Sequence, residues 1–267
     1  MAPARASDPA ITGRIVTGER AVTGRAGFNP SWQRHVFAYA QAARFLGPGR
    51  VLDLGCGTGH SFELLAPRET VGVDRDARSL AGQARETVAA DMRALPFDAA
   101  SFDSIVCMHA IEHVPDAAAV LAEAVRVLRD GGTAIFVTPN RLTFGRPDEI
   151  IDPYHYVEYD PRQLAALLEP FFADVEVHGV FGSARQLALV DAEHRRLDKL
   201  LGLDPLKLRR LVPRRLRAFL YDLMLTRARR HATPEVAAID QTDFQLGDAD
   251  LDRSLDLFAV VSGPRRP

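Results

Sequence analysis

The stretch Val51-Leu52-Asp53-Leu54-Gly55-Cys56-Gly57-Thr58-Gly59-His60 decides the fold. A short apolar run ends in a glycine-rich turn, and a helical pattern follows from Ser61 to Ala66. A strand, a tight turn and a helix N-terminus in this order are typical of nucleotide-type sites. Gly55 and Gly57 let the backbone turn sharply and come close to a ligand. The free N–H groups at the start of the helix would then face that ligand.

The spacing of the turn distinguishes it from a dinucleotide site. Such a site reads G-x-G-x-x-G and holds a pyrophosphate, whereas here the turn reads G-x-G-x-G and Asp53 precedes it. A carboxylate is a poor neighbour for pyrophosphate and a good one for an amino group or a sulfonium. The motif D-x-G-x-G-x-G at the end of a first strand resembles motif I of the class I S-adenosylmethionine (SAM) methyltransferases. This resemblance implies cofactor binding by Asp53, Gly55, Cys56, Gly57 and Gly59.

Two further strands are expected to deliver carboxylates to the same edge of the sheet. The second strand, residues 70–73, ends in Asp74, about 20 residues after the first glycine, where the acidic residue of a dinucleotide site accepts the ribose hydroxyls. The third strand, residues 87–90, ends in Asp91 and Met92. There the methyltransferase resemblance implies a carboxylate for the adenine amino group and a side chain that packs on its ring. The expected cofactor-binding residues therefore also include Asp74, Arg75, Asp91, Met92 and Met108.

The rest of the chain alternates apolar strand patterns with amphipathic helix patterns. Further strands are expected at residues 101–106, 133–137, 175–177 and 255–261, and helices at 30–46, 117–128 and from 161 onward. The segments 91–97 and 101–106 resemble the UbiE-like subgroup. The fold implied is α/β, a Rossmann-like seven-stranded methyltransferase sheet with its last strand antiparallel beside the fifth. The predicted parts are an N-terminal arm (1–29), a SAM-binding core (30–182), a basic helical insertion or lid (183–250), and the last strand with its tail (251–267).

Composition limits the class of protein. The 267 residues are 47% hydrophobic and 25% charged, which is ordinary for a soluble globular chain. The formal net charge of -2 predicts no general attraction to nucleic acid or anionic membrane. Cys56 and Cys107 are too few for a disulfide framework or a zinc site, so a reducing cytoplasm fits best. No signal peptide and no apolar run of about 20 residues is found, so we expect no transmembrane segment.

Three histidines on loops at the same edge of the sheet, His109, His113 and His155, are candidate catalytic bases. Methyl transfer from a sulfonium is an in-line displacement, and a hydroxyl acceptor must lose a proton to a base or a metal-bound group. His155 is the first candidate, because it lies in the loop after the fifth strand among polar residues; alternatively, it only orders that loop. His113, after the fourth strand, is the second. The pattern His109-x-x-Glu112-His113 resembles the divalent-metal cluster of ubiquinone-pathway O-methyltransferases, which has Glu where this chain has His109. That resemblance leaves a divalent metal such as Mg²⁺ open.

A narrower resemblance concerns the acceptor. Four segments, residues 17–20, 34–35, 138–144 and 152–155, are similar to methylmannose-polysaccharide-type sugar O-methyltransferases. These have a T-G-E-R arm, a T-P-N-R-x-T-F turn and a P-F/Y-H loop; Tyr154 replaces the more usual Phe. The resemblance implies a saccharide hydroxyl as acceptor, in an oligosaccharide or small molecule, and supports His155 as base.

Three alternatives remain open: a methyltransferase for phenols or polyketides, a nucleic-acid methyltransferase, and a non-catalytic SAM-binding module. The segment from Arg195 to Arg230 holds 12 Lys and Arg against 3 Asp, with leucine stripes. Such a face is typical of a helical cap, a homodimer surface or a membrane-adjacent helix. The N/D-P-P-Y motif of base methylation is missing after the fourth strand, so a nucleic-acid partner is disfavoured.

Overall fold

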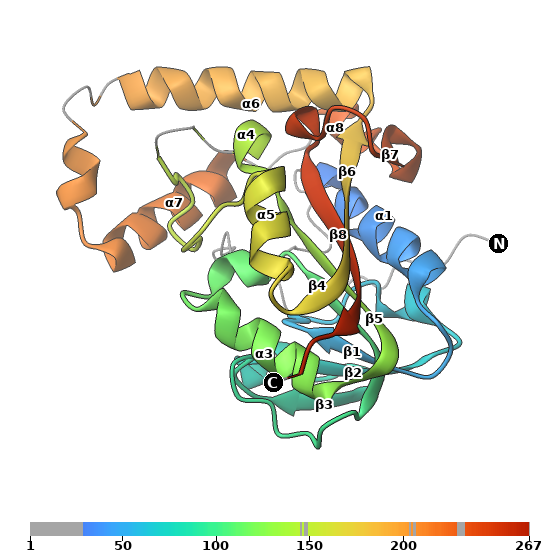
Figure 1. The fold of residues 1–267 in the computed structure, drawn as a ribbon. Coiled ribbons are helices and arrows are strands. Elements are labelled where there is room, and N and C mark those ends of the chain that lie inside the picture. The colour runs from blue at the N-terminus through green and yellow to red at the C-terminus, as the bar shows by residue number, and fades with distance from the viewer. Residues whose placement is uncertain are drawn as a thin grey trace.

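The computed structural model describes residues 29–266 apart from 145, 147–148, 203, 205–206 and 229–232. A single eight-stranded sheet has the order β3-β2-β1-β4-β5-β8-β6-β7, and helices cover both of its faces (Figure 1). The strands are β1 (Arg50–Leu54), β2 (Glu69–Asp74), β3 (Glu86–Ala89), β4 (Phe102–Met108), β5 (Leu128–Pro139), β6 (Phe172–Gly182), β7 (Phe244–Gly247) and β8 (Asp256–Pro264).

The described helices differ widely in length. The α-helices are α1 (Asn29–Phe45), α2 (Ala77–Leu80), α3 (Ala117–Val127), α4 (Arg141–Phe144), α5 (Pro161–Leu168), α6 (Ala184–Gly202), α7 (Arg214–Ala228) and α8 (Pro234–Ala237). Short 3-10 helices are η3 (Phe62–Leu65), η4 (Ile111–His113), η5 (Leu208–Leu211), η6 (Gln241–Asp243) and η7 (Leu251–Arg253). In the part of the chain described, no helix combines the length and the apolar character that a membrane span requires.

Parallel pairing brings the ends of the first strands together. β1 pairs in parallel with β2 on one side and β4 on the other, and β3 continues the sheet beyond β2. Asp74 is the last residue of β2 and Met108 the last of β4. Because parallel strands end at the same edge of a sheet, the turns that follow them face one common space.

The sheet has one strand more than the seven expected. β8 lies antiparallel beside β5, as predicted, and β6 pairs with it on the other side. The additional strand β7 pairs antiparallel with β6, inside the segment expected to be helical. β7 is only four residues long, and its alternation of apolar and polar side chains is too short to be recognised in the sequence. Its Phe244 is buried and contacts Phe37 of α1 at a ring-centroid distance of 6.0 Å.

The helix expected after the glycine turn is also different. Residues 61–66 form only the 3-10 turn η3, and Ser61 before it has a left-handed backbone with φ 70°. Pro67 limits the length of this helix, because a proline disfavours the helical conformation of the residue that precedes it. The glycine turn is therefore followed by a short 3-10 turn, and not by a long helix whose N-terminus could face a ligand.

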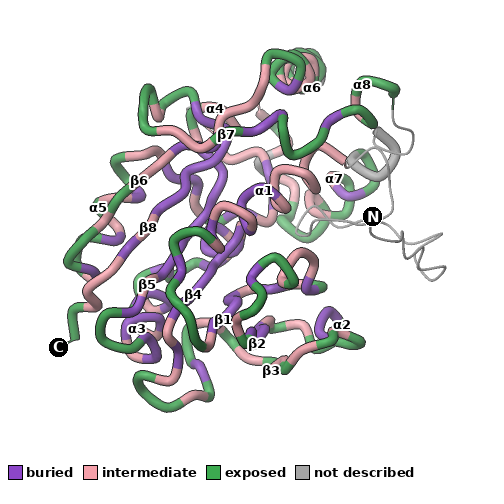
Figure 2. The backbone as a smooth tube through the Cα atoms, turned by 90° about the vertical axis from the view of Figure 1, so that its right-hand side faces the viewer, coloured by how far each residue is buried: buried purple, intermediate pink, exposed green. Residues whose placement is uncertain are grey.

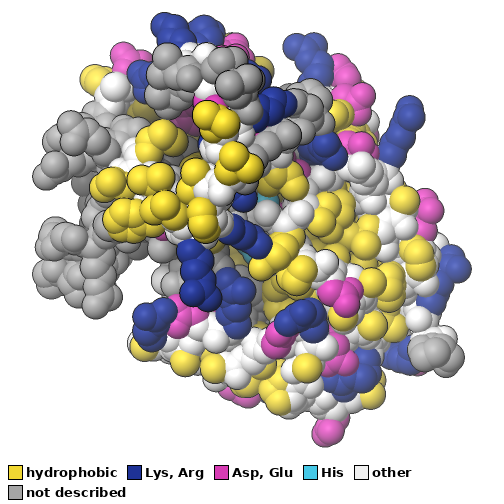
Figure 3. Space-filling model, turned by 90° about the vertical axis from the view of Figure 1, so that its left-hand side faces the viewer, with side chains coloured by type: hydrophobic (Ala, Val, Ile, Leu, Met, Phe, Trp, Pro, Cys, Tyr) yellow, Lys and Arg dark blue, Asp and Glu magenta, His cyan; other side chains and the backbone are white. Residues whose placement is uncertain are grey.

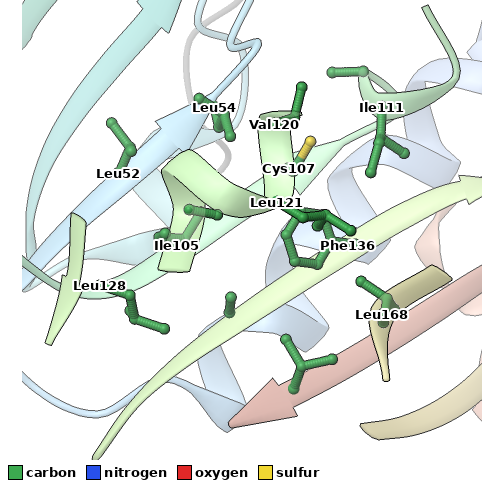
Figure 4. Packing of buried hydrophobic residues seen from close by; sticks show 14 of the residues in the cluster. Leu52, Leu54, Ile105, Cys107, Ile111, Val120, Leu121, Leu128, Phe136 and Leu168 are labelled. Atoms are coloured by element: carbon green, nitrogen blue, oxygen red, sulfur yellow. The ribbon is translucent and has the colours of Figure 1, made fainter. Parts of the chain in front are cut away.

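Two apolar clusters hold the helices on the sheet. On one face, α3 and α5 pack against side chains of β1, β4 and β5, among them Leu52, Ile105 and Phe136 (Figure 4). On the other face, α1 packs through Phe37, Ala38, Tyr39 and Ala42. Figure 2 shows that burial is concentrated along the central strands. Asp116 caps α3 by accepting from Ala119 N–H at 3.1 Å.

The segment expected as a basic insertion contains α6 and α7, which lie at one end of the molecule beside the loop after β5 (Figure 1). The predicted arm of residues 1–29 lies outside the described residues, except Asn29, which begins α1. Residues 17–20 lie outside them as well.

Asn140 anchors the loop that leaves β5. Its buried side-chain amide donates to the carbonyl oxygens of Leu251 at 2.9 Å and Ser254 at 3.0 Å, and its Oδ1 accepts from Leu142 N–H at 3.1 Å. Thr143 Oγ1 donates to the same Ser254 oxygen at 2.6 Å. The turn of residues 138–144 thus fixes the start of the loop against the segment before β8.

We expect Asn140→Ala to lower the free energy of unfolding by roughly 2–3 kcal/mol, because it leaves buried carbonyl groups without a donor. Asn140→Asp should destabilise at least as much, since a carboxylate would face the oxygens to which the amide now donates. Thr143→Val removes a single hydrogen bond and should cost about 1 kcal/mol. Urea unfolding followed by circular dichroism measures all three, and an Asp variant as stable as the parent would contradict this account.

Candidate cofactor and catalytic site

A cavity lies at the carboxyl ends of β1, β2 and β4. Its empty volume, including the open mouth, is about 940 Å³, within the usual range for a small-molecule site. Most of its wall comes from the turns after these strands, and α1 supplies the rest. The lining residues are His35, Tyr39, Gly55, Cys56, Gly57, Thr58, His60, Asp74, Arg75, Asp91, Met92, Arg93, Met108, His109, Ala110, His113, Val114 and Pro115.

Most of the residues expected from the sequence meet in this cavity. The expected residues that line it are Gly55, Cys56, Gly57, Asp74, Arg75, Asp91, Met92, Met108 and His113. Three others do not line it: Asp53 lies beneath it, Gly59 closes the turn, and His155 lies behind His113. The cavity therefore gathers side chains that are far apart in the sequence.

The glycine turn forms the floor of the cavity. Gly55 has φ +76°, and a Cβ at this position would come within 2.4 Å of the Cβ of Ala110. Both the backbone conformation and the close approach therefore require glycine. Gly57 has φ +53° and opens onto free space, so its backbone can approach a ligand directly. Burial raises the pKa of the neighbouring Cys56 thiol to about 12, which makes this thiol a poor nucleophile.

Asp74 is held in place by backbone donors. Its Oδ2 accepts from Gly57 N–H at 2.9 Å, and its Oδ1 accepts from Asp76 N–H at 2.8 Å. Each carboxylate oxygen can accept more than one hydrogen bond. The side chain is thus oriented by the turn and still able to receive hydroxyl groups from the cavity.

Asp91 is half exposed at the other side of the cavity. Arg93 donates to it from Nε at 3.0 Å and from Nη2 at 2.6 Å. These bonds, together with the backbone N–H of Arg93, lower the pKa of Asp91 to about 2, so the carboxylate stays ionised at neutral pH. Met92 lies against Gly55: its sulfur is 3.2 Å from the position that a Cβ on Gly55 would occupy. A flat ring in the cavity would meet Met92 and the acceptor oxygens of Asp91 together.

Asp53 stabilises the cavity wall from below. It is 1% exposed, pairs with Arg85 at 2.7 Å and accepts from the hydroxyl of Tyr39 at 3.0 Å. Its charge is therefore balanced by a guanidinium group that the sequence spacing does not reveal. Tyr39, which lines the cavity, is the residue that Asp53 positions. The expectation that this carboxylate itself contacts a cation is replaced by an indirect role.

Of the imidazole groups in the wall, sequence reasoning missed only His60. His35 of α1 stacks on His109 with ring centroids 4.2 Å apart, and His60 lies 5.3 Å from His35. Burial is the main cause that lowers the pKa of His35 well below 6.5. The charges of His109, His60 and Arg34 lower this pKa further. Burial and the charges of His109 and Arg85 lower the pKa of His60 to about 4. Both rings are neutral at physiological pH.

Arg34 points away from the cavity. It pairs with the fully buried Asp256 at 3.2 Å, and His109 Nε2 lies 3.4 Å from the same carboxylate oxygen. His109 itself has a left-handed backbone with φ 50°, which is uncommon outside glycine. Arg34 and His35 are neighbours on α1, so the sequence indicates that one of them could reach the site. The packing of α1 turns His35 toward the cavity and Arg34 toward Asp256.

A second group of side chains lies next to the cavity. His113 and His155 meet edge to face with ring centroids 4.9 Å apart, and Glu112 completes the cluster. Tyr156 N–H donates to the carbonyl oxygen of Glu112 at 2.8 Å, which ties the loop after β5 to η4. His155 is 9% exposed, and its Nδ1 lies 3.0 Å from Glu158 Oε1.

These three side chains are the described residues whose ligand atoms could meet at one metal ion, since those atoms lie within 4.8 Å of one another. Both carboxylate oxygens of Glu112 are buried and have no hydrogen-bond partner among the described residues, which suits a nearby positive charge. One carboxylate and two imidazoles, however, suit Mn²⁺, Fe²⁺ or Zn²⁺ better than Mg²⁺, which prefers oxygen ligands. His109, the departure from the ubiquinone-pathway pattern, is not part of the cluster. The donor set therefore does not suit Mg²⁺, the ion that the resemblance left open.

Comparison with known proteins agrees with this geometry. A family model described as a methyltransferase domain matches residues 52–136. A probable S-adenosylmethionine-dependent methyltransferase of Mycolicibacterium smegmatis is 35% identical over 262 residues, which cover 93% of this chain and 95% of that protein. The chain belongs to the S-adenosylmethionine-dependent methyltransferases. A relative of the same description from Mycobacterium tuberculosis is 32% identical, covering 98% of this chain and 93% of its own length.

Other similarities of this methyltransferase are more limited. A ubiquinone biosynthesis O-methyltransferase of Hahella chejuensis is 38% identical over 107 residues, which cover 35% of this chain and 45% of that protein. A crystal structure from Thermotoga maritima, described as a possible histamine N-methyltransferase, has a TM-score of 0.55 at 18% identity and covers 89% of this chain and 96% of its own. That likeness concerns the fold alone. The cofactor of this family is SAM.

Asp74→Ala should weaken SAM binding by roughly 1–3 kcal/mol, because charged hydrogen bonds to the cofactor hydroxyls are lost. Isothermal titration calorimetry measures the change in affinity. Asp76→Ala is the matched control: it removes a neighbouring carboxylate that caps α2 and does not line the cavity. Equal SAM affinity in the Asp74 variant and the parent would rule out the ribose role.

Proposed function

We propose that this methyltransferase moves the methyl group of SAM to a hydroxyl group of a saccharide or glycoside. The observation that carries the proposal is that His113 lines the cofactor cavity and is in ring contact with His155, with the buried carboxylates of Glu112 and Glu158 beside the pair. SAM, when bound, supplies a methyl carbon whose bond to sulfur breaks as the acceptor oxygen attacks in line. The acceptor hydroxyl must lose its proton, so a base within hydrogen-bond reach is needed.

His113 is the proposed proton acceptor. It lines the cavity, and its Nδ1 lies 3.3 Å from the carbonyl oxygen of Tyr154. Since a carbonyl can only accept, Nδ1 carries the hydrogen and Nε2 keeps its lone pair. The imidazole is therefore held in the tautomer that a general base requires.

His155 and two carboxylates support this base from behind. His155 donates from Nδ1 to Glu158, and Glu112 offers two buried oxygens without hydrogen-bond partners in the described chain. When His113 takes up a proton, the positive charge forms next to these groups. Fixed negative charge in a buried site stabilises such a charge strongly. His155, the first candidate from sequence, becomes the positioning residue of the pair.

The wall opposite the base suits hydroxyl groups. His35 and His60 are neutral, so each offers one N–H donor and one lone pair. Neutral rings also avoid repulsion of the positively charged methyl donor. A saccharide, with many adjacent hydroxyl groups, could use donors and acceptors of this kind together, and the sequence resemblance to sugar O-methyltransferases points the same way.

A small phenol is the second candidate acceptor. The match to a ubiquinone biosynthesis O-methyltransferase favours it, although that match is confined to 35% of this chain. The same base would serve a phenol, because the proton and the attacking oxygen are arranged in the same way. The two candidates differ in what surrounds the reacting oxygen, which an acceptor screen can separate.

Incubation with radiolabelled SAM and a panel of oligosaccharides, phenols and RNA tests the proposal. We expect label on saccharides, and a rate at least about 100-fold lower in His113→Ala, as for loss of a general base. SAM affinity should be nearly unchanged in His155→Ala. Label on phenols alone would establish the second candidate, and label on RNA or on no acceptor would reject both.

Chelation is the control for this experiment. The proposed base needs no metal, so activity should survive treatment with a chelator. Loss of activity that Mn²⁺ or Zn²⁺ restores would reassign Glu112, His113 and His155 as metal ligands and remove His113 as the base.

The rate should rise with pH as His155 loses its proton. Burial lowers the pKa of His155, but the hydrogen bond to Glu158 and the charges of Glu112, Asp152 and Glu158 outweigh it and raise the pKa above 6.5. Below that pKa, a charged His155 next to His113 opposes proton uptake. Glu158→Gln removes the hydrogen-bonded charge, so the acid limb of kcat/KM should move to lower pH. Glu176→Gln, which changes an exposed side chain of β6, is the control. An unmoved limb in Glu158→Gln would contradict the role of His155.

A further inference from the structure

Helix α7 is amphipathic, but its apolar face is exposed to solvent and its polar face is turned toward the protein. Its apolar residues follow the spacing of a helical stripe, yet they are exposed: Phe219 is 51% and Leu220 50% accessible. Together with η5, they form what we name the α7 surface, composed of Leu208, Leu211, Leu216, Phe219, Leu220, Leu223 and Met224. Figure 3 shows hydrophobic side chains gathered on this side of the molecule, with Lys and Arg beside them.

The polar face of α7 is the one turned toward the protein. Tyr221 donates from its hydroxyl to the buried Asp152 at 3.1 Å, and Asp222 accepts from the hydroxyl of Tyr154. Arg214 at the start of the helix lies over the ring of Tyr156 at 3.8 Å. Normal packing buries the apolar stripe of a helix and exposes its polar face. Here the polar contacts occupy the inner face, so the stripe remains outside.

Charge around the α7 surface is strongly positive. Residues 207–224 contain six Lys and Arg against one Asp, the buried Asp222. One of the six, Arg209, is paired with Glu149 at 2.5 Å and with Asp204 at 3.1 Å. Arg214 and Arg215 are exposed at the edge of the apolar stripe. The whole chain has a net charge of -2, so this positive charge is local. An apolar stripe bordered by Arg and Lys is the pattern of helices that lie in a lipid interface.

We propose that the α7 surface docks on an anionic lipid bilayer, with the leucine and phenylalanine side chains in the interface and the Arg side chains at the lipid phosphates. A second copy of the chain is disfavoured, because a two-fold interface would gather two copies of the same local positive charge at its border. Residues 1–28 are disfavoured as a cover too, since they carry four Arg against two acidic residues. A second copy of the chain and residues 1–28 would each add positive charge to a surface that is already positive.

Docking of a bilayer on the α7 surface would bring the lipid close to the loop after β5. Asp152, Tyr154 and Tyr156, which α7 contacts, immediately surround His155 in the chain. A bilayer on the outer face of α7 would therefore lie one helix away from the loop that holds His155, the positioning residue. The inference concerns binding only and does not depend on which hydroxyl is methylated.

Co-flotation with vesicles tests the proposal on the full chain. We expect binding to phosphatidylcholine vesicles that contain 30% phosphatidylglycerol, and little binding to pure phosphatidylcholine. Arg215→Glu should weaken the partitioning roughly 30-fold, through loss of one attraction and gain of one repulsion. Phe219→Glu combined with Leu223→Glu should weaken it at least about 30-fold. Leu187→Glu, an exposed leucine of α6, is the matched control and should bind as the parent does.

SAM affinity, measured for every variant, reports whether the fold and the cofactor cavity are intact. Absence of binding to anionic vesicles by the parent, or equal binding to neutral ones, would overturn the proposal. So would sedimentation showing a dimer that the Phe219 and Leu223 substitutions dissociate, because the surface would then be covered by a second copy. Loss of vesicle binding in Leu187→Glu would also overturn it.

Discussion

The cofactor cavity depends on the close approach of two turns at the carboxyl edge of the sheet. The turn after β1 and the turn after β4 come so near that a single Cβ on Gly55 would overlap Ala110. This approach follows from the parallel pairing of β1 and β4, which ends the two strands side by side. Both turns use left-handed backbone, at Gly55 and at His109. Glycine adopts that conformation freely and histidine does not, so the tight packing around His109 must hold it.

Charge in and under the cavity is balanced in a way that suits a cationic ligand. The buried carboxylate of Asp53 is paired with Arg85, so the floor carries no uncompensated charge. In the wall, burial and neighbouring charges lower the pKa values of His35 and His60 and keep these two rings neutral. Asp74 and Asp91 then remain as the carboxylates that face the cavity. A positively charged donor therefore meets acceptors at two strand ends and the neutral rings of His35 and His60, and Arg75 and Arg93 complete the charged part of the lining.

The sequence predicts those parts of the site that depend on strand ends. Asp74 and Asp91 follow apolar runs, and in a parallel sheet their positions follow directly from the order of the strands. Partners that meet only through packing could not be predicted: Arg85 lies 32 residues after Asp53, and nothing in that spacing indicates a pair. The orientation of α1, which turns His35 inward and Arg34 toward Asp256, depends likewise on the final fold. The strand β7 was missed because four residues are too few to show a period.

The loop after β5 connects the chemistry to the outer surface of the molecule. Asn140 fixes its start, the bond from Tyr156 to Glu112 brings His155 against His113, and α7 closes over it through Tyr221 and Asp222. Methyl transfer benefits when water is excluded from the reacting atoms, and a loop with three separate anchors can do this without a long lid. These polar contacts explain why the inner face of α7 is polar. They leave its apolar stripe without a role inside the protein, and a stripe of this size persists on a folded surface where a partner covers it.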